Sequence, residues 1–160
     1  MQKEKKELYT PTFHYNDGGR EESGYKGVTG DCVTRAIAIA SGLPYQKVYD
    51  DLFEATKTFA DSKARCKVAR SLRKTGCSPR KGVFRKIYEP YLHNNGFEWV
   101  SVMGIGKGCT IHVKADELPE GSLILRLSKH LTAFVDGVLQ DTYDCSREGT
   151  RCVYGYFIKR

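Results

Sequence analysis

The chain has 160 residues, with 26 Lys+Arg against 19 Asp+Glu and six cysteines. This length predicts a single domain over residues 1–160. A hydrophobic content of 40% predicts a folded core and excludes wholesale disorder. No stretch approaches the roughly 20 apolar residues that span a bilayer, and the charged N-terminus has no apolar segment behind it, which argues against a secretory signal. We therefore expect a cytoplasmic protein without a membrane partner.

The six cysteines lie at positions 32, 66, 77, 109, 145 and 152. In a chain without a secretory signal, cysteines are more often thiols than a disulfide framework. They form no Cys-x-x-Cys pair, and no close cysteine pair is followed by two histidines, so the spacing predicts no structural zinc site. We expect at most one or two of them to do chemistry, and we predict neither a metal nor a cofactor.

The first half of the chain has the start and stop signals of helices. Residues 1–12 are charged and predict a flexible arm, and a short extended segment then leads through the turn Asn16-Asp17-Gly18-Gly19 into a glycine-rich loop. The expected helices cover residues 32–41, with Asp31 as N-cap and Gly42 as C-cap, a segment from Pro44, residues 61–74, and a segment from Ser78-Pro79 to Gly96.

The second half has the alternation of strands. The expected strands are 97–103, 110–113, 122–127, 130–135, 138–143 and 151–157. Helices followed by strands predict an α+β protein, in which N-terminal helices pack on a C-terminal antiparallel sheet or partly closed barrel.

Cys32 is a candidate nucleophile because it opens a predicted helix. The unpaired N–H groups and positive dipole at that position favour thiolate over thiol. The same N–H groups can hold a developing oxyanion. A buried cysteine without reactivity is the alternative interpretation.

His130 and Asp141 are the candidate base and orienting carboxylate. Asp136-Gly137 between alternating runs predicts a two-residue hairpin, in which Val135 pairs with Val138 and Thr132 lies opposite Asp141. In this register His130 and Asp141 share a face as diagonal neighbours, about 7–8 Å apart at the backbone. A carboxylate placed there can orient an imidazole that activates a thiol.

The order of these residues resembles the papain-like cysteine peptidase superfamily. Gly30-Asp31-Cys32 opens a helix, 118–122 leads into a strand, and His130 and Asp141 follow on a hairpin. The chain is most similar to small members such as the bacteriocin-processing and Josephin-type peptidases, over residues 27–145. These segments also resemble those of uncharacterised phage or prophage proteins, which would place the chain in a bacterial or phage-infected cell. The resemblance implies a papain-like fold and cleavage of a peptide or isopeptide bond in a protein or peptide substrate.

One family feature has no counterpart here. Papain-like peptidases usually carry a glutamine five or six residues before the nucleophile, where this chain has Lys26 and Gly27. The candidate oxyanion donors are therefore the Cys32 backbone N–H, Thr29 and Asn16. The loss of one such donor costs about 10²–10³ in rate.

The excess positive charge is local. Residues 63–86 carry ten basic residues and no Asp or Glu, so the rest of the chain has a formal charge of −3. This pattern predicts binding of nucleic-acid phosphate or of an acidic protein partner, although a solvated helix face remains open. The residues are Lys63, Arg65, Lys67, Arg70, Arg73, Lys74, Arg80, Lys81, Arg85 and Lys86.

Three functions follow as hypotheses. The first is a thiol hydrolase with a Cys32-His130-Asp141 triad. The second is a non-catalytic module on the same fold that binds nucleic acid or an acidic partner through residues 63–86. The third is an interaction protein that uses the fold to block another enzyme.

Overall fold

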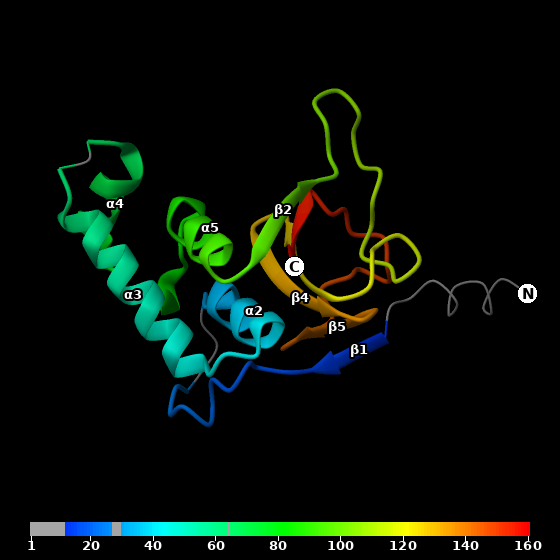
Figure 1. Cartoon of the computed structure of the whole chain (residues 1–160), viewed down its shortest axis with the longest axis horizontal. Helices are drawn as coiled ribbons and strands as arrows, with labels where there is room; N and C mark the ends of the chain where they lie inside the picture. Colours follow the sequence, from blue (N-terminus) through cyan, green and yellow to red (C-terminus); the bar gives the residue numbers. More distant parts are fainter. Residues whose placement is uncertain (1–11, 27–29, 64) are drawn as a thin grey trace, which may run out of the picture.

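Helices precede most of the strands in the computed structural model, which describes residues 12–26, 30–63 and 65–160 (Figure 1). The helices are α2 (Cys32–Ser41), α3 (Tyr45–Asp61), α4 (Lys67–Thr75) and α5 (Arg85–Asn94), with a short 3₁₀ turn η1 (Pro79–Lys81) before α5. Strands β2 (Phe97–Ser101), β3 (Ser122–Leu127), β4 (His130–Val135), β5 (Val138–Asp141) and β6 (Gly155–Lys159) follow. The predicted α+β class is confirmed at this level.

One strand precedes the helices. β1 (Thr12–Tyr15) pairs with β5 in parallel, and the six strands form one sheet in the order β1-β5-β4-β3-β6-β2. The expectation of a purely antiparallel sheet is therefore wrong, since a long-range parallel pairing has no local sequence signal. Among the described strands the sheet is open, with β1 and β2 at its edges, rather than a partly closed barrel. Thr12 belongs to β1, and the rest of the predicted arm lies outside the described residues.

The hairpin register is confirmed. Val135 pairs with Val138, Phe134 with Leu139 and Ala133 with Gln140. Asp136 and Gly137 both have positive φ, as a two-residue turn of this kind requires. This register carries His130 and Asp141 to the same end of the hairpin.

Other boundaries differ from the expectation. The helix expected over 61–74 begins later, because Asp61 is still the last residue of α3 and α4 starts only at Lys67. The segment expected to begin a helix at Pro79 makes one 3₁₀ turn, and Gly82, with φ of 100°, ends it before α5. The strand expected over 110–113 is absent; His112 makes only an isolated bridge to Cys152.

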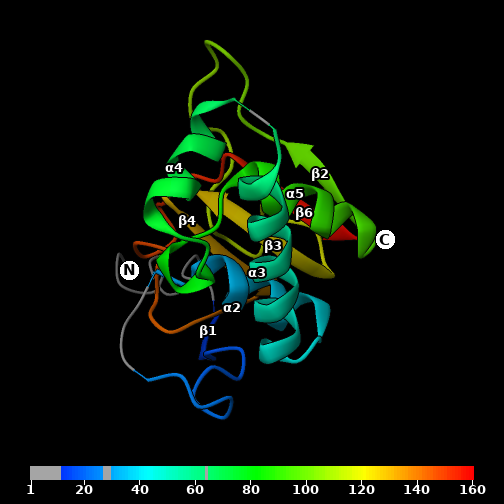
Figure 2. The same cartoon turned by 90° about the vertical axis from the view of Figure 1, so that its left-hand side faces the viewer.

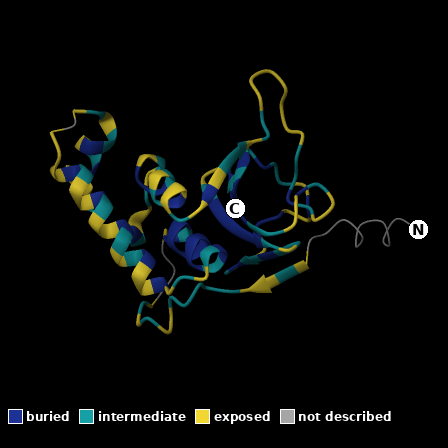
Figure 3. Ribbon diagram, viewed as in Figure 1, coloured by how far each residue is buried: buried dark blue, intermediate teal, exposed yellow. Residues whose placement is uncertain are grey.

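The sheet separates two hydrophobic clusters. On one face α2 lies between the sheet and α3, and α5 completes the layer (Figure 2). Ile37, Leu52, Leu92 and Phe157 are fully buried there. The other face is covered by irregular segments around 102–121 and 142–154. Val113, Leu118 and Val153 of these segments are buried in one cluster with alternate residues of β3. Figure 3 shows the buried strands between these layers and an exposed loop beyond β2. No helix in the described ranges is long and apolar enough to cross a membrane.

Candidate active site

Cys32 is the first residue of α2, with its side chain partly buried against the sheet. Burial opposes the thiolate and raises the pKa of the thiol. Hydrogen bonding to His130 and to the Leu131 backbone, together with the nearby charge of His130, outweighs burial, so that the pKa of Cys32 is lowered. The surroundings of Cys32 therefore favour the thiolate over the thiol.

Asp31 does not cap α2 as expected. It stands at the N-cap position but makes no side-chain cap hydrogen bond. Its fully buried carboxylate instead accepts hydrogen bonds from the Arg35 Nε at 2.9 Å, from Arg20 at 3.1 Å and from the Tyr45 hydroxyl at 2.7 Å. A buried carboxylate needs such partners, so Asp31 fixes the helix start through an ion pair.

His130 and Asp141 are in direct contact. The His130 Nε2 lies 2.7 Å from the Asp141 Oδ2, and both side chains are largely buried. Burial opposes both charges, but each group stabilises the other: the pKa of His130 is raised and that of Asp141 is lowered. The carboxylate therefore holds the imidazole through Nε2, and a histidine oriented in this way can act as an acid or base.

Asp141 is held by further donors that sequence reasoning missed. Its Oδ2 accepts a hydrogen bond from the Thr132 hydroxyl at 2.8 Å, and its Oδ1 accepts one from Arg35 Nη1 at 2.6 Å. Arg35 therefore bridges the carboxylates of Asp31 and Asp141. The four-residue spacing of Asp31 and Arg35 on a helix was the available signal.

The three predicted oxyanion donors differ in their position relative to Cys32. The Asn16 side-chain amide donates to Gln140 Oε1 at 2.9 Å, and its carbonyl accepts from the Gly18 N–H. Asn16 does not line the two hollows beside Cys32, so the structure does not bring it to the sulfur. Thr29 lies outside the described residues. The backbone N–H of Cys32, at the start of α2, is the candidate donor that remains.

Two hollows meet at Cys32 and His130, which line both together with Gly30 and Lys129. One, of about 460 Å³, includes Val83, Phe84, Tyr88, Leu131 and Tyr154. The other, of about 480 Å³, includes Tyr15, Arg20, Thr142 and Tyr143. A chain lying across both hollows would present a bond to the Cys32 sulfur.

The basic stretch begins before α4 with Lys63 and Arg65 and continues through α4 and η1 to the start of α5. Four of its members have structural contacts. Arg73 donates to the carbonyls of Ala60 and Ser62 at the end of α3, and Arg85 pairs with Glu89 and stacks over Trp99. Arg80 and Lys81 donate to backbone carbonyls. Exposed members are Lys63, Arg65, Lys67, Arg70, Arg73, Lys74, Lys81 and Lys86.

The expectation that the cysteines are thiols is wrong for one pair. Cys109 and Cys152 form a disulfide, whereas Cys32, Cys66, Cys77 and Cys145 are free. The two partners are 43 residues apart, in segments whose pairing depends on the tertiary fold, so sequence spacing could not reveal it.

Comparison with protein-family models, with curated proteins and with solved structures gives no match. The interpretation of the site therefore depends on its own geometry.

Proposed function

We propose that the chain is a thiol hydrolase that cleaves a peptide or isopeptide bond, on a papain-like arrangement of helix and sheet. The observation that carries the proposal is the approach of Cys32, His130 and Asp141, from three separate elements, at the junction of two hollows. An exposed hairpin with an incidental His and Asp would not bury the carboxylate and give it four donor groups.

The chemistry follows from the positions of the groups. The Cys32 thiolate attacks the carbonyl carbon, and a carbon–sulfur bond forms while the carbonyl electrons move to oxygen. Protonated His130 gives its proton to the leaving nitrogen as the carbon–nitrogen bond breaks, which leaves a thioester. Water then attacks the thioester with neutral His130 as base, and the acid and the thiolate are released. Asp141 stays ionised and holds the imidazole in position.

The test is a comparison of thiol reactivity in the full chain. We expect an electrophilic peptide probe to label Cys32 far faster than Cys66 or Cys77, and labelling to vanish in Cys32→Ala. In His130→Ala we expect the rate to fall by about 10²–10⁴, the usual contribution of a positioned acid–base group. Cys66→Ser is the matched control and should leave the Cys32 rate unchanged. Equal labelling of the accessible thiols would contradict the proposal.

Turnover needs its own measurement. We expect a peptide mixture incubated with wild-type protein to give new termini, detected by mass spectrometry, and Cys32→Ala to give none. Cleavage that persists in Cys32→Ala would assign the activity to another site or a contaminant.

Binding of an anionic partner by the basic stretch is a second candidate, favoured by the exposure of eight of its ten basic side chains. We expect a labelled oligonucleotide to bind more weakly as salt rises, and neutralisation of Lys67, Arg70 and Lys74 to reduce both affinity and the salt slope. The matched control is neutralisation of Lys47 and Lys57 on α3. Binding that does not respond to salt would contradict phosphate recognition.

A further inference from the structure

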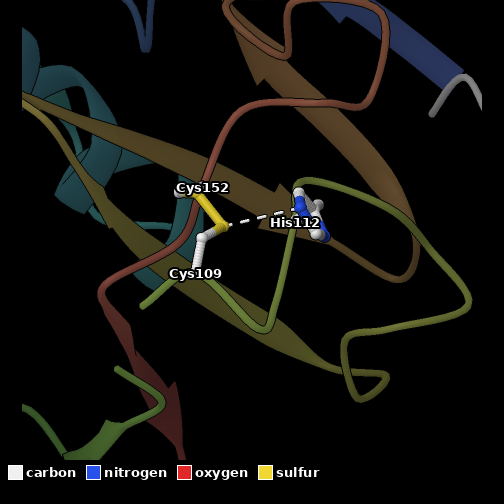
Figure 4. Close-up of side chains that lie close together, drawn as sticks. All are labelled: Cys109, His112 and Cys152. Atoms are coloured by element: carbon white, nitrogen blue, oxygen red, sulfur yellow. Dashed lines mark hydrogen bonds between the residues drawn. A yellow bond between two sulfur atoms is a disulfide. The ribbon is translucent and has the colours of Figure 1, made fainter. Parts of the chain in front are cut away.

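A second cluster of reactive side chains lies on the sheet face opposite the helices. Cys109 and His112 belong to the irregular segment between β2 and β3, and Cys152 comes shortly before β6 (Figure 4). The disulfide and the His112–Cys152 bridge bring the two segments together. This cluster shares no residue with the Cys32 site.

Three side chains that can bind a metal lie close together in this cluster. The Cys109 Sγ lies 3.4 Å from the His112 Nε2, and one ligand atom from each of Cys109, His112 and Cys152 lies within 4.8 Å of the others. Zinc bonds of about 2.3 Å to sulfur and about 2.0–2.1 Å to nitrogen, at a tetrahedral angle, place those two ligand atoms about 3.5 Å apart. The sulfur–imidazole spacing is therefore already that of a zinc site.

Glu117 supplies the outer contact that histidine ligands normally have. Its Oε1 lies 3.1 Å from the His112 Nδ1. A proton held on Nδ1 by this carboxylate leaves the lone pair of Nε2 directed at the sulfur atoms, which is how metal-binding histidines are oriented. A surface disulfide does not need an imidazole oriented in this way.

We propose that, when Cys109 and Cys152 are reduced, the two thiolates and the His112 Nε2 bind one Zn²⁺, with Glu117 orienting the imidazole and water as fourth ligand. A dithiol reductant supplies the two electrons and two protons that convert the disulfide into two thiols, and is itself oxidised to a disulfide. Zinc then replaces the two thiol protons. The oxidised pair and the bound metal are alternative ways to join the same two segments.

The test uses the full chain with Cys32→Ser, which removes the other candidate thiolate. After reduction with a phosphine under nitrogen, the protein is titrated with Co²⁺ as a spectroscopic probe. We expect one ion per chain, with thiolate-to-cobalt charge-transfer bands and tetrahedral ligand-field bands, both abolished by added Zn²⁺. The oxidised protein should show none of these bands.

Variants assign the ligands. Cys109→Ser and Cys152→Ser should each lose the charge-transfer band or halve its intensity, and Glu117→Gln, which keeps the side-chain shape, should weaken binding about 10–100-fold. His14→Ala removes an exposed histidine elsewhere and should have no effect. Absence of a stoichiometric cobalt complex in the reduced protein, or a complex unchanged in Cys109→Ser and Cys152→Ser, would overturn the proposal.

Discussion

Arg35 joins the start of α2 to the end of β5. Arg35 is 6% exposed, and its guanidinium contacts the carboxylates of Asp31 and Asp141 at the same time. Burial disfavours its charge, but the two carboxylates more than compensate, so its pKa is raised. In the proposed triad Arg35 is therefore a positioning residue, because it holds the carboxylate that orients His130. It also lines the hollow beside Cys32, and its charge helps to lower the pKa of that thiol.

Replacement of Arg35 tests this role. We expect Arg35→Met to lower the free energy of unfolding by about 3–5 kcal/mol, because it leaves buried carboxylates with fewer partners. Urea denaturation measures the change. Lys47→Met removes an exposed pair with Asp51 and should cost less than about 1 kcal/mol.

Arg35→Lys separates positioning from folding. It keeps the charge but cannot span two carboxylates as a fork, so we expect a folded protein with slower Cys32 alkylation. An unchanged alkylation rate in folded Arg35→Lys would limit Arg35 to a structural role.

The lowered pKa of Cys32 predicts a pH dependence. The thiolate is present above the pKa of the folded thiol, so alkylation should remain fast well below the ordinary thiol pKa of about 8.5. In His130→Ala the hydrogen bond and the neighbouring charge are lost, so the midpoint should move to higher pH. Alkylation rates measured over a range of pH give the midpoints of wild type and of His130→Ala. Coincident midpoints would show that His130 does not act on the thiol.

At the scale of elements, β6 can approach β2 closely because Gly155 has no side chain. A Cβ on Gly155 would overlap the Cη2 of Trp99 and lie 2.7 Å from the Val100 carbonyl oxygen. Trp99 has little freedom to move, since its ring is 4.8 Å from that of Phe157 and Arg85 lies over it at 4.3 Å. Gly155 is therefore required by the packing of the indole across two strands.

Gly155→Ala should destabilise the protein by about 1–3 kcal/mol, the usual cost of overpacking. Thermal unfolding followed by circular dichroism measures the effect. Gly104→Ala is the matched control, because the added Cβ meets only the flexible side chain of Lys107 and should have little effect. Equal melting temperatures for Gly155→Ala and wild type would contradict the claim that the packing of Trp99 requires glycine at this position.

The sequence predicted those elements whose signals are local. The bounds of β3 and β4 and the register of the β4–β5 hairpin follow from strict alternation and from one Asp-Gly turn. The pairing of β1 with β5 depends on residues more than 120 positions apart, and no local pattern encodes it. The contact of His130 with Asp141 was predictable because both lie on one hairpin. The contributions of Arg35 and Thr132 were not, because they depend on how α2 packs against that hairpin.

At the scale of the molecule, the Cys109–Cys152 disulfide ties together the irregular layer that covers one face of the sheet. It closes a loop with a sequence separation of 43, and chain-entropy arguments give such a cross-link about 4 kcal/mol of stabilisation.

Reduction should therefore lower the free energy of unfolding by up to about 4 kcal/mol, measured by urea denaturation with metal excluded by a chelator. The double variant Cys109→Ser, Cys152→Ser should reproduce the loss and should no longer respond to reductant. Cys66→Ser is the control and should respond as wild type does. A reductant effect that persists in the double variant would contradict this assignment.

The same cross-link divides the proposed triad between two parts of the chain. His130 and Asp141 lie inside the covalent ring between Cys109 and Cys152, whereas Cys32 lies outside it. The ring also contains an exposed turn at Arg147 and Glu148, both with positive φ. A protease that cuts the oxidised chain in that turn would open the ring without releasing a fragment, so β3, β4 and β5 would stay attached to the C-terminal β6. Only reduction would then separate the nicked chain into two pieces.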